Sequence, residues 1–329
     1  MDRKQGMTTK NRLLAFLKEN RGVWVSGESV SNKIDVSRSA VWKQIRKLKA
    51  EGYVIDSSSK KGYRLLEVPD ALIPNEIRDG LSTRVIGWEA IHHFVETDST
   101  NILAKEYAEK GATEGTLVLA EAQTKGKGRK GRSWFSPSQG GIYLSLILRP
   151  SLTPAESPKI TLLGAVAMAD TLLPLTGLDI RIKWPNDLLV RGKKIAGILT
   201  EMSTETDRVH YIVLGVGLNV NMRHFPGPIQ ETATSLFVET GKSFSRIEIL
   251  KGFLQNFETY YDLFMEKGFE PVLKRWKAMS DMIGRRIRVD MIDGTIIGTV
   301  QDVSEEGVLI LKDEKGRPQR IFSGDITLL

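Results

Sequence analysis

The chain has 329 residues, 41% of them hydrophobic, and carries 47 Lys and Arg against 40 Asp and Glu, a net charge of +7. This length is sufficient for two or three domains. The absence of cysteine excludes disulfides, thiol nucleophiles and cysteine-based zinc sites, and the four histidines lack ligand spacing, so we expect no resident metal. The polar N-terminus and the interrupted apolar runs predict a cytoplasmic protein without a signal peptide or membrane span.

The positive charge is concentrated at the N-terminus. Residues 1–64 contain 15 Lys and Arg against 6 Asp and Glu, a net charge of +9, whereas the remaining residues are close to neutral. Such an uneven distribution is typical of a nucleic-acid-binding module attached to a nearly neutral body.

The periodicity of this basic segment predicts three short helices followed by a hairpin. The first two helices are marked by apolar faces at residues 13–17 and 30–34, and Ser26 is a suitable N-cap for the second. In the third, Val41 and Ile45 are spaced as a buried stripe. The hairpin follows over residues 53–66. Three helices and a wing in this order resemble a winged helix-turn-helix.

The outward face of the third helix is polar and basic, as in a recognition helix that enters a major groove. Lys and Arg suit phosphates, and Ser or Trp suits base edges. The DNA-binding residues that we expect on this helix and at the tip of the wing are Arg38, Ser39, Trp42, Lys43, Arg46, Lys60 and Lys61. The alternative is a protein-binding module, because the same fold also serves that purpose.

Taken together, the patterns along the whole chain predict an α+β protein of three parts. We expect a winged helix-turn-helix at 1–66, a linker at 67–76, a central mixed-sheet α/β catalytic domain at 77–280, and a small SH3-like β-barrel at 281–329. In the central part, strands are expected near 91–95, 116–120, 142–148, 180–190, 195–201 and 211–220, and helices near 100–111, 158–175 and 245–267.

The stretch GKGRKGRSW, residues 126–134, contains four cations and three glycines and ends on an aromatic ring. Glycine allows backbone N–H groups to approach a ligand closely, and this density of cations indicates a phosphate site. Its G-x-G-x-x-G spacing does not indicate a Rossmann loop, because no helix can start at Arg132 to Pro137. A P-loop is excluded because no GK[ST] follows. The alternative is a solvated basic loop.

Three further motifs lie in the central part. Ser99-Thr-Asn101 stands at a strand-to-helix junction and is suited to a small polar ligand, although an ordinary N-cap is the alternative. KWPND, residues 183–187, places a cation, an amide and a carboxylate at the end of an apolar strand. KIAGIL, residues 194–199, brings a lysine into a buried strand, where it requires an anion unless it reaches the surface.

These motifs, together with Gln123 and the sequence GVGLN at 215–219, occur in the order and at the spacing that resemble the biotin protein ligases. With the winged helix in front, the whole chain resembles the bifunctional biotin ligase/repressors of bacteria. One departure concerns Lys127, which stands where the family loop usually has arginine. A lysine keeps the positive charge of the arginine but lacks its two parallel N–H donors, so we expect a different contact between residue 127 and the ligand.

The resemblance implies a two-step reaction that uses biotin, ATP and Mg²⁺. Biotin and ATP form biotinyl-5′-AMP, and a lysine of a biotin carboxyl carrier domain in a biotin-dependent carboxylase then takes the biotinyl group. Arg129 and Lys194 would be catalytic, holding the carboxylate beside the α-phosphate. Biotin would be bound by Ser99, Thr100, Asn101, Gln123, Lys127, Gly128, Arg129, Lys194 and Gly197. The nucleotide would be bound by Arg132, Trp134, Lys183, Asn186 and Asn219, with Trp134 stacked on adenine.

The resemblance also implies that the protein forms a ligand-promoted homodimer on the operator DNA of biotin genes, and that the C-terminal part helps to cover the nucleotide or the carrier protein. A purely structural C-terminal cap is the alternative for that part. Two other functions remain open from the sequence: a biotin-sensing repressor without catalysis, and a lipoate- or octanoate-type protein ligase.

Overall fold

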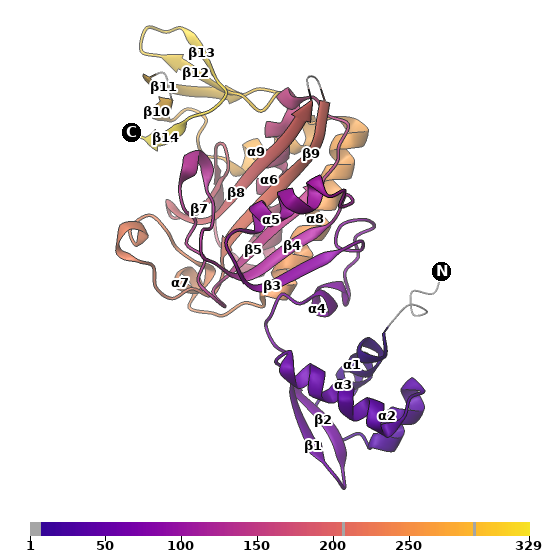
Figure 1. Cartoon of the computed structure of the whole chain (residues 1–329). Helices are drawn as coiled ribbons and strands as arrows, with labels where there is room; N and C mark the ends of the chain where they lie inside the picture. Colours follow the sequence, from indigo (N-terminus) through magenta and orange to yellow (C-terminus); the bar gives the residue numbers. More distant parts are fainter. Residues whose placement is uncertain (1–7, 206–207, 292–293) are drawn as a thin grey trace. The chain divides into compact units, whose positions relative to one another are not determined.

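The computed structural model describes residues 8–205, 208–291 and 294–329 (Figure 1). The chain divides into two compact units, Met1–Asp70 and Ala71–Leu329. This division lies inside the expected linker 67–76. Leu72 is fully buried in the larger unit, and the helix α4 (Pro74–Arg78) begins before the linker was expected to end.

The smaller unit is a winged helix-turn-helix. Its elements are α1 (Thr9–Glu19), α2 (Gly27–Ile34), α3 (Arg38–Ala50) and the antiparallel strands β1 (Val54–Ser58) and β2 (Gly62–Glu67). Each helix begins at a hydroxyl residue, Thr8, Ser26 or Ser37, whose side chain accepts a backbone N–H of the first turn. The stripe expected on α3 is buried, with Val41 and Ile45 at most 2% exposed. The predicted fold of this segment is confirmed.

The central part of the larger unit alternates strands with helices. After α4 its strands are β3 (Ile91–Thr97), β4 (Leu117–Gln123), β5 (Gly141–Leu148), β6 (Ile180–Lys183), β7 (Asp187–Val190), β8 (Lys193–Glu205) and β9 (Arg208–Asn219). Its helices are α5 (Thr100–Glu109), α6 (Ser157–Thr176), α7 (Leu236–Thr240), α8 (Arg246–Lys267) and α9 (Glu270–Met279), and short 3₁₀ turns lie at Arg129–Gly131, Pro154–Glu156 and Gly227–Ile229.

The seven strands form one sheet in the order β3-β4-β5-β9-β8-β7-β6. The pair β3 and β4 is parallel and all the other pairs are antiparallel. The sheet is therefore mixed, as predicted. Helices α6, α8 and α9 lie on one of its faces and α5 lies on the other (Figure 1). Within the described residues, only the segment Pro154–Thr176 is a helix long and apolar enough to cross a membrane, and α6 is mostly buried in this core.

The alternation of side chains along β9 determines where a hollow can form. Tyr211 and Val213 point to the face that α5 covers, and they pack with its alanines. The next two residues on the same face, Gly215 and Gly217, have no side chain. The sheet therefore carries no side chain of its own at these two positions, beside the N-terminus of α5.

The C-terminal part is an antiparallel sheet of five strands. They are β10 (Arg286–Met291), β11 (Gly294–Val303), β12 (Leu309–Asp313), β13 (Pro318–Ile321) and β14 (Asp325–Leu328), in the order β13-β12-β11-β10-β14. We call it the C-terminal sheet. Its Ile287 and Val289 belong to the same hydrophobic cluster as the central helices, and the indole Nε1 of Trp184 donates to Gly307 O at 3.0 Å. Packing is thus continuous across the boundary expected at 280/281.

Candidate active site

A cavity of about 150 Å³ lies over the glycine positions of the sheet. Its floor is formed by Gly215 and Gly217 of β9 and by Gly197 of β8, which pairs with Gly217. A Cβ atom at Gly215 would lie 2.2 Å from Asn101 Oδ1, and one at Gly217 would lie 2.4 Å from Trp134 Cε2. Neither position has room for a side chain, so glycine is required by close approach.

The cavity brings together nearly all the site residues predicted from the sequence. Its lining includes the predicted biotin-binding residues Ser99, Thr100, Asn101, Gln123, Lys127, Gly128, Arg129, Lys194 and Gly197, and the predicted nucleotide-binding residues Arg132, Trp134, Lys183 and Asn186. Asn219 is not part of the lining. It is buried, and its Nδ2 donates to Thr234 O at 2.9 Å. This side chain fixes the segment after β9 instead of pointing into the cavity.

The N-terminus of α5 is capped from outside the helix. Ser99 occupies the N-cap position, but its side chain makes no capping bond. Gln123, at the end of β4, accepts the backbone N–H of Thr100 at 2.8 Å. Asn101 donates to Glu201 at 2.8 Å, and Ser145 Oγ lies 2.6 Å from Asn101 Oδ1. The first turn of α5 is therefore held by its neighbours, and the Ser99 hydroxyl makes no bond to its own helix.

The basic stretch 126–134 forms a narrow loop that is closed at its base. Trp134 N donates to Gly126 O at 2.8 Å, and Gly128 N donates to Arg132 O at 2.7 Å. The tip is a 3₁₀ turn in which Lys130 has a φ of 54°. Ser136 connects the base to β4, because its Oγ accepts from Gln123 Nε2 at 2.9 Å. The residues that cap α5 and the residues that hold the loop are thus linked.

Trp134 lies in the cavity against the glycine floor. Its ring atoms are the nearest atoms to the position where a side chain of Gly217 would begin, and its Cζ3 lies 3.1 Å from the corresponding position at Gly197. The Lys194 Nζ lies 5.1 Å from the ring centroid. The buried indole Nε1 has no hydrogen-bond partner within the described part of the chain. The stacking of this ring on adenine stays a prediction.

Two cations of the cavity are partly withdrawn from water. Burial lowers the pKa of Arg129 and the pKa of Lys183 from their usual values, although the carboxylates of Asp187 and Asp325 oppose both shifts. A positive charge in such a place gains strongly from an anionic ligand. This electrostatic setting suits a carboxylate or a phosphate.

Lys194 is held at both its backbone and its ammonium group. Its N–H donates to Thr232 O at 2.8 Å, and its carbonyl accepts from Thr234 N at 2.9 Å. Its Nζ forms an ion pair with Asp187 Oδ1 at 2.6 Å. Asp187 was quoted in the KWPND motif but not predicted as a site residue. Its pairing with a lysine on the neighbouring strand could not be read from the motif alone.

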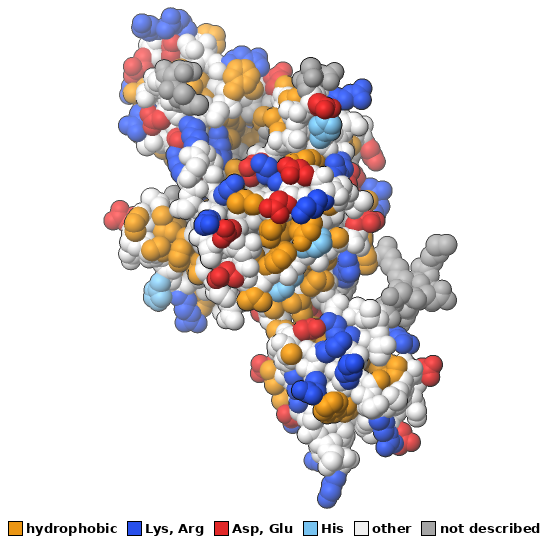
Figure 2. All heavy atoms as spheres, viewed as in Figure 1, with side chains coloured by type: hydrophobic (Ala, Val, Ile, Leu, Met, Phe, Trp, Pro, Cys, Tyr) orange, Lys and Arg blue, Asp and Glu red, His pale blue; other side chains and the backbone are white. Residues whose placement is uncertain are grey.

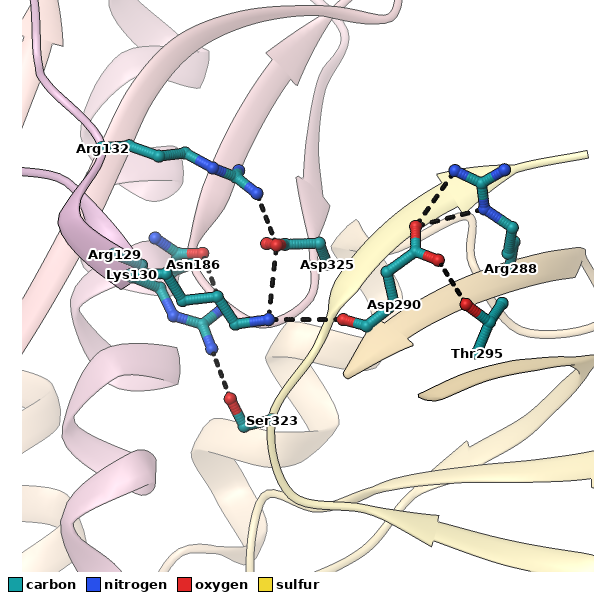
Figure 3. Close-up of polar contacts among 9 residues, drawn as sticks. All are labelled: Arg129, Lys130, Arg132, Asn186, Arg288, Asp290, Thr295, Ser323 and Asp325. Atoms are coloured by element: carbon teal, nitrogen blue, oxygen red, sulfur yellow. Dashed lines mark hydrogen bonds and ion pairs between the residues drawn. The ribbon is translucent and has the colours of Figure 1, made fainter. Parts of the chain in front are cut away.

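The C-terminal sheet also contributes to the cavity. Asp325, the first residue of β14, lines it and forms ion pairs with Arg132 and, at 3.3 Å, with Lys130 (Figure 3). Arg129 lies between Ser323 Oγ, at 3.1 Å, and Asn186 Oδ1, at 3.4 Å. Sequence reasoning missed Asp325, because nothing near it in the chain distinguishes it from the other carboxylates of this segment.

The described residues contain no group of three or more His, Asp or Glu side chains placed to hold a metal ion. Two carboxylates reach the cavity, Asp187 and Asp325, and both are paired with cations. Mg²⁺ often binds through substrate phosphates and retains several waters. This donor set fits a magnesium ion that enters with a triphosphate.

The smaller unit presents the predicted DNA-binding residues at its surface. Arg38, Ser39, Trp42, Lys43 and Arg46 are exposed on α3, and Lys60 and Lys61 are exposed at the turn between β1 and β2. Trp42 is 54% exposed, and the Arg46 guanidinium lies 4.9 Å from its ring centroid. Lys and Arg side chains are spread over the visible face of this unit (Figure 2).

The fold and the site define a class of protein: a ligase that activates a carboxylic acid with a nucleotide, joined to a winged-helix DNA-binding unit. Residues 93–219 match the biotin/lipoate A/B protein ligase family, residues 9–64 match an HTH domain, and residues 282–329 match the biotin protein ligase C-terminal domain.

Similar proteins cover nearly the whole chain. The bifunctional ligase/repressor BirA of Bacillus subtilis (strain 168) is 40% identical over 98% of this chain and 99% of its own length. The bifunctional ligase/repressor BirA of Escherichia coli (strain K12) is 30% identical over 98% of this chain and 97% of its own. A solved structure, the biotin protein ligase from Aquifex aeolicus in complex with biotin and ATP, has a TM-score of 0.64 at 30% identity and covers 74% of this chain and 99% of its own. The chain belongs to the family of bifunctional biotin protein ligase/repressors.

Proposed function

We propose that this protein activates biotin with ATP, transfers it to a lysine of a biotin carboxyl carrier domain, and represses transcription of biotin genes in response to biotin. The observation that carries the proposal is the cavity, which collects four separate sequence motifs and five cationic side chains over one glycine floor. A winged-helix unit in the same chain supports the second role.

In the first step the biotin carboxylate attacks the α-phosphorus of ATP. A bond forms between the carboxylate oxygen and phosphorus, the bond to the bridging oxygen breaks, and pyrophosphate leaves. Arg129 and Lys194 bring the two anions together, because both cations face the cavity. Lys194 exchanges its ion pair with Asp187 for the incoming anion. Arg132, Lys183 and Asn186 hold the nucleotide, whose phosphates bring Mg²⁺ with them.

The groups around α5 bind the biotin end of the substrate. Ser99, Thr100, Asn101 and Gln123 offer hydroxyl and amide groups to the ureido ring, and the floor of Gly197 allows a flat bicycle to lie on the sheet. Lys127 and Gly128 complete the rim. Asn219 acts indirectly, by fixing the segment whose carbonyl and N–H groups bind the backbone of Lys194.

In the second step the neutral ε-amine of the carrier lysine attacks the acyl carbon of biotinyl-5′-AMP. An amide forms, the bond from the acyl carbon to the phosphate oxygen breaks, AMP leaves with the electron pair, and the attacking nitrogen loses a proton to water. Since acyl phosphates hydrolyse readily, the loop 126–134 protects the adenylate from water.

Regulation follows from the two activities in one chain. Protein that has bound biotinyl-5′-AMP but finds no acceptor forms a homodimer and presents two winged helices to a two-fold operator. The residues that contact DNA are the seven exposed residues predicted on α3 and on the wing. The protein acts in the cytoplasm, where carboxylases and DNA are both accessible.

The test incubates the protein with biotin, ATP, Mg²⁺ and a carrier domain, followed by streptavidin blotting and by mass spectrometry for bound biotinyl-5′-AMP. Modification of the carrier domain with biotin but not with lipoate supports the proposal. Modification with lipoate but not with biotin would contradict it. Arg129→Ala should slow adenylate formation by about 100-fold or more. A gel shift in which biotin plus ATP leaves the affinity of the protein for operator DNA unchanged would contradict the regulatory role.

A further inference from the structure

The loop 126–134 is tied to the C-terminal sheet as well as to its own base. Lys130 Nζ lies 3.3 Å from Asp325 Oδ2 and donates to Asp290 O at 3.3 Å, and Arg132 pairs with the same Asp325 carboxylate (Figure 3). One side chain of β14 thus binds two of the four cations of the loop. These contacts join residues that are 160 or more positions apart in the chain.

The two cations differ in where they lie. Arg132 and Asp325 both line the cavity, whereas Lys130 does not. Lys130 thus lies outside the cavity lining, and its contacts with Asp325 and Asp290 hold the tip of the loop. Lys130 and Asp325 are both about one third exposed, so the pair is partly shielded from solvent.

The contact of Lys130 with Asp325 also restricts where the Arg129 side chain can lie. This residue stands next to Lys130 in the 3₁₀ turn and reaches Ser323, two residues before Asp325, at 3.1 Å. When the tip of the loop is held against β14, the Arg129 guanidinium is fixed between Ser323 and Asn186. Asp325 therefore acts on the reaction through the loop.

We propose that Asp325 is a positioning residue that holds the loop closed over the adenylate until a carrier domain arrives. The inference rests on the proposed function, since it concerns the lifetime of the biotinyl-5′-AMP that the site makes. The C-terminal sheet is then part of the active site and more than a structural cap.

The experiment measures the loss of preformed, enzyme-bound biotinyl-5′-AMP from the full-length protein in the absence of acceptor. Asp325→Asn should shorten its lifetime by about threefold to tenfold, and Lys130→Gln by a smaller factor. The double variant should lose the adenylate faster by less than the product of the two single effects, because both changes break the same contact between Lys130 and Asp325. Added salt should shorten the wild-type lifetime toward that of Asp325→Asn.

Asp290→Asn is the matched control. It removes a carboxylate of the neighbouring strand whose side chain binds Arg288 and Thr295, and it leaves the backbone oxygen that Lys130 uses (Figure 3). Its adenylate lifetime should change less than that of Asp325→Asn, because the Asp290 carboxylate acts on Lys130 only through its charge and makes no ion pair with it. Equal melting temperatures for all variants would exclude general unfolding as the cause.

An unchanged adenylate lifetime in Asp325→Asn would overturn the inference without affecting the proposed function. If the KM for ATP fell at the same time, Asp325 would be a competitor of the phosphates. If the wild-type protein formed no adenylate from biotin and ATP, the proposed function itself would fail.

Discussion

Replacing Gly217 with alanine tests whether the indole of Trp134 is seated on the glycine floor. The added Cβ would lie 2.4 Å from Trp134 Cε2, and ordinary contact begins at 3.4 Å, so the ring must move by about 1 Å. The backbone of Gly217 presents no obstacle, because it does not have a positive φ. The whole effect should therefore come through Trp134.

The structure also limits how the ring can respond. The indole touches the neighbouring Gly197 position at 3.1 Å on the same floor, and it lies under the Lys194 ammonium. A shift away from the floor narrows the cavity and presses on Lys194. Overpacking of this kind costs roughly 1–3 kcal/mol, equivalent to a loss in kcat/KM for biotin of about 5-fold to 150-fold.

The assay is pyrophosphate release at varied biotin concentration, with Gly27→Ala as the control. Gly27 lies in the smaller unit, and an added Cβ there meets its first neighbour at 3.9 Å. A double-mutant cycle identifies the cause: in a Trp134→Ala background, Gly217→Ala should have little additional effect. Equal losses in both backgrounds, or unchanged kinetics in the single variant, would refute the seating of the indole.

Two further predictions concern the buried carboxylate of Glu121 and the DNA-binding unit. Burial opposes the ionisation of Glu121, but the hydrogen bond to His93 and the charge of Arg246 outweigh it and lower its pKa from 4.5 to about 2. It should contribute on the order of 2–3 kcal/mol of stability above pH 4.5, after allowance for screening, and lose it as the pH falls toward 2. Urea unfolding of wild type and Glu121→Gln should therefore converge at low pH; a constant difference would contradict this. Arg46→Ala should weaken DNA binding uniformly and reduce the salt slope by about 1, with unchanged biotinylation. Gel shifts at several salt concentrations measure this, and an unaltered slope would exclude a phosphate contact.

Elements with a strong local period could be predicted from the sequence. The stripe of Val41 and Ile45 on α3 and the alternation along β9 each repeat over several residues, and the structure has a helix and a strand there. The helix α9 was missed, although Val272, Leu273 and Trp276 lie on its buried face. It is short and follows directly on α8, so that its own pattern does not stand apart from that of the longer helix.

Local sequence motifs were sufficient to predict which residues line the cavity, but not which residues those side chains contact. The lining residues come from motifs in which unlike side chains stand close together in the sequence. The role of Asn219 depends on the path of the chain after β9, which brings the Thr234 carbonyl to its amide. Asp325 faces the loop only because β14 pairs with β10 at the edge of the C-terminal sheet. Tertiary packing alone decides both.

The charge balance of the cavity indicates when the Asp325 contact matters most. Its lining carries five cations and two carboxylates, a net charge of +3. Biotin brings about −1 and Mg·ATP about −2, so the two substrates neutralise the site. Once pyrophosphate and Mg²⁺ leave, the adenylate retains only about −1, and the loop faces an excess of positive charge again. At that stage the carboxylate of Asp325 is the anion placed to keep Lys130 and Arg132 in position. Its loss should therefore affect retention of the adenylate more than binding of ATP.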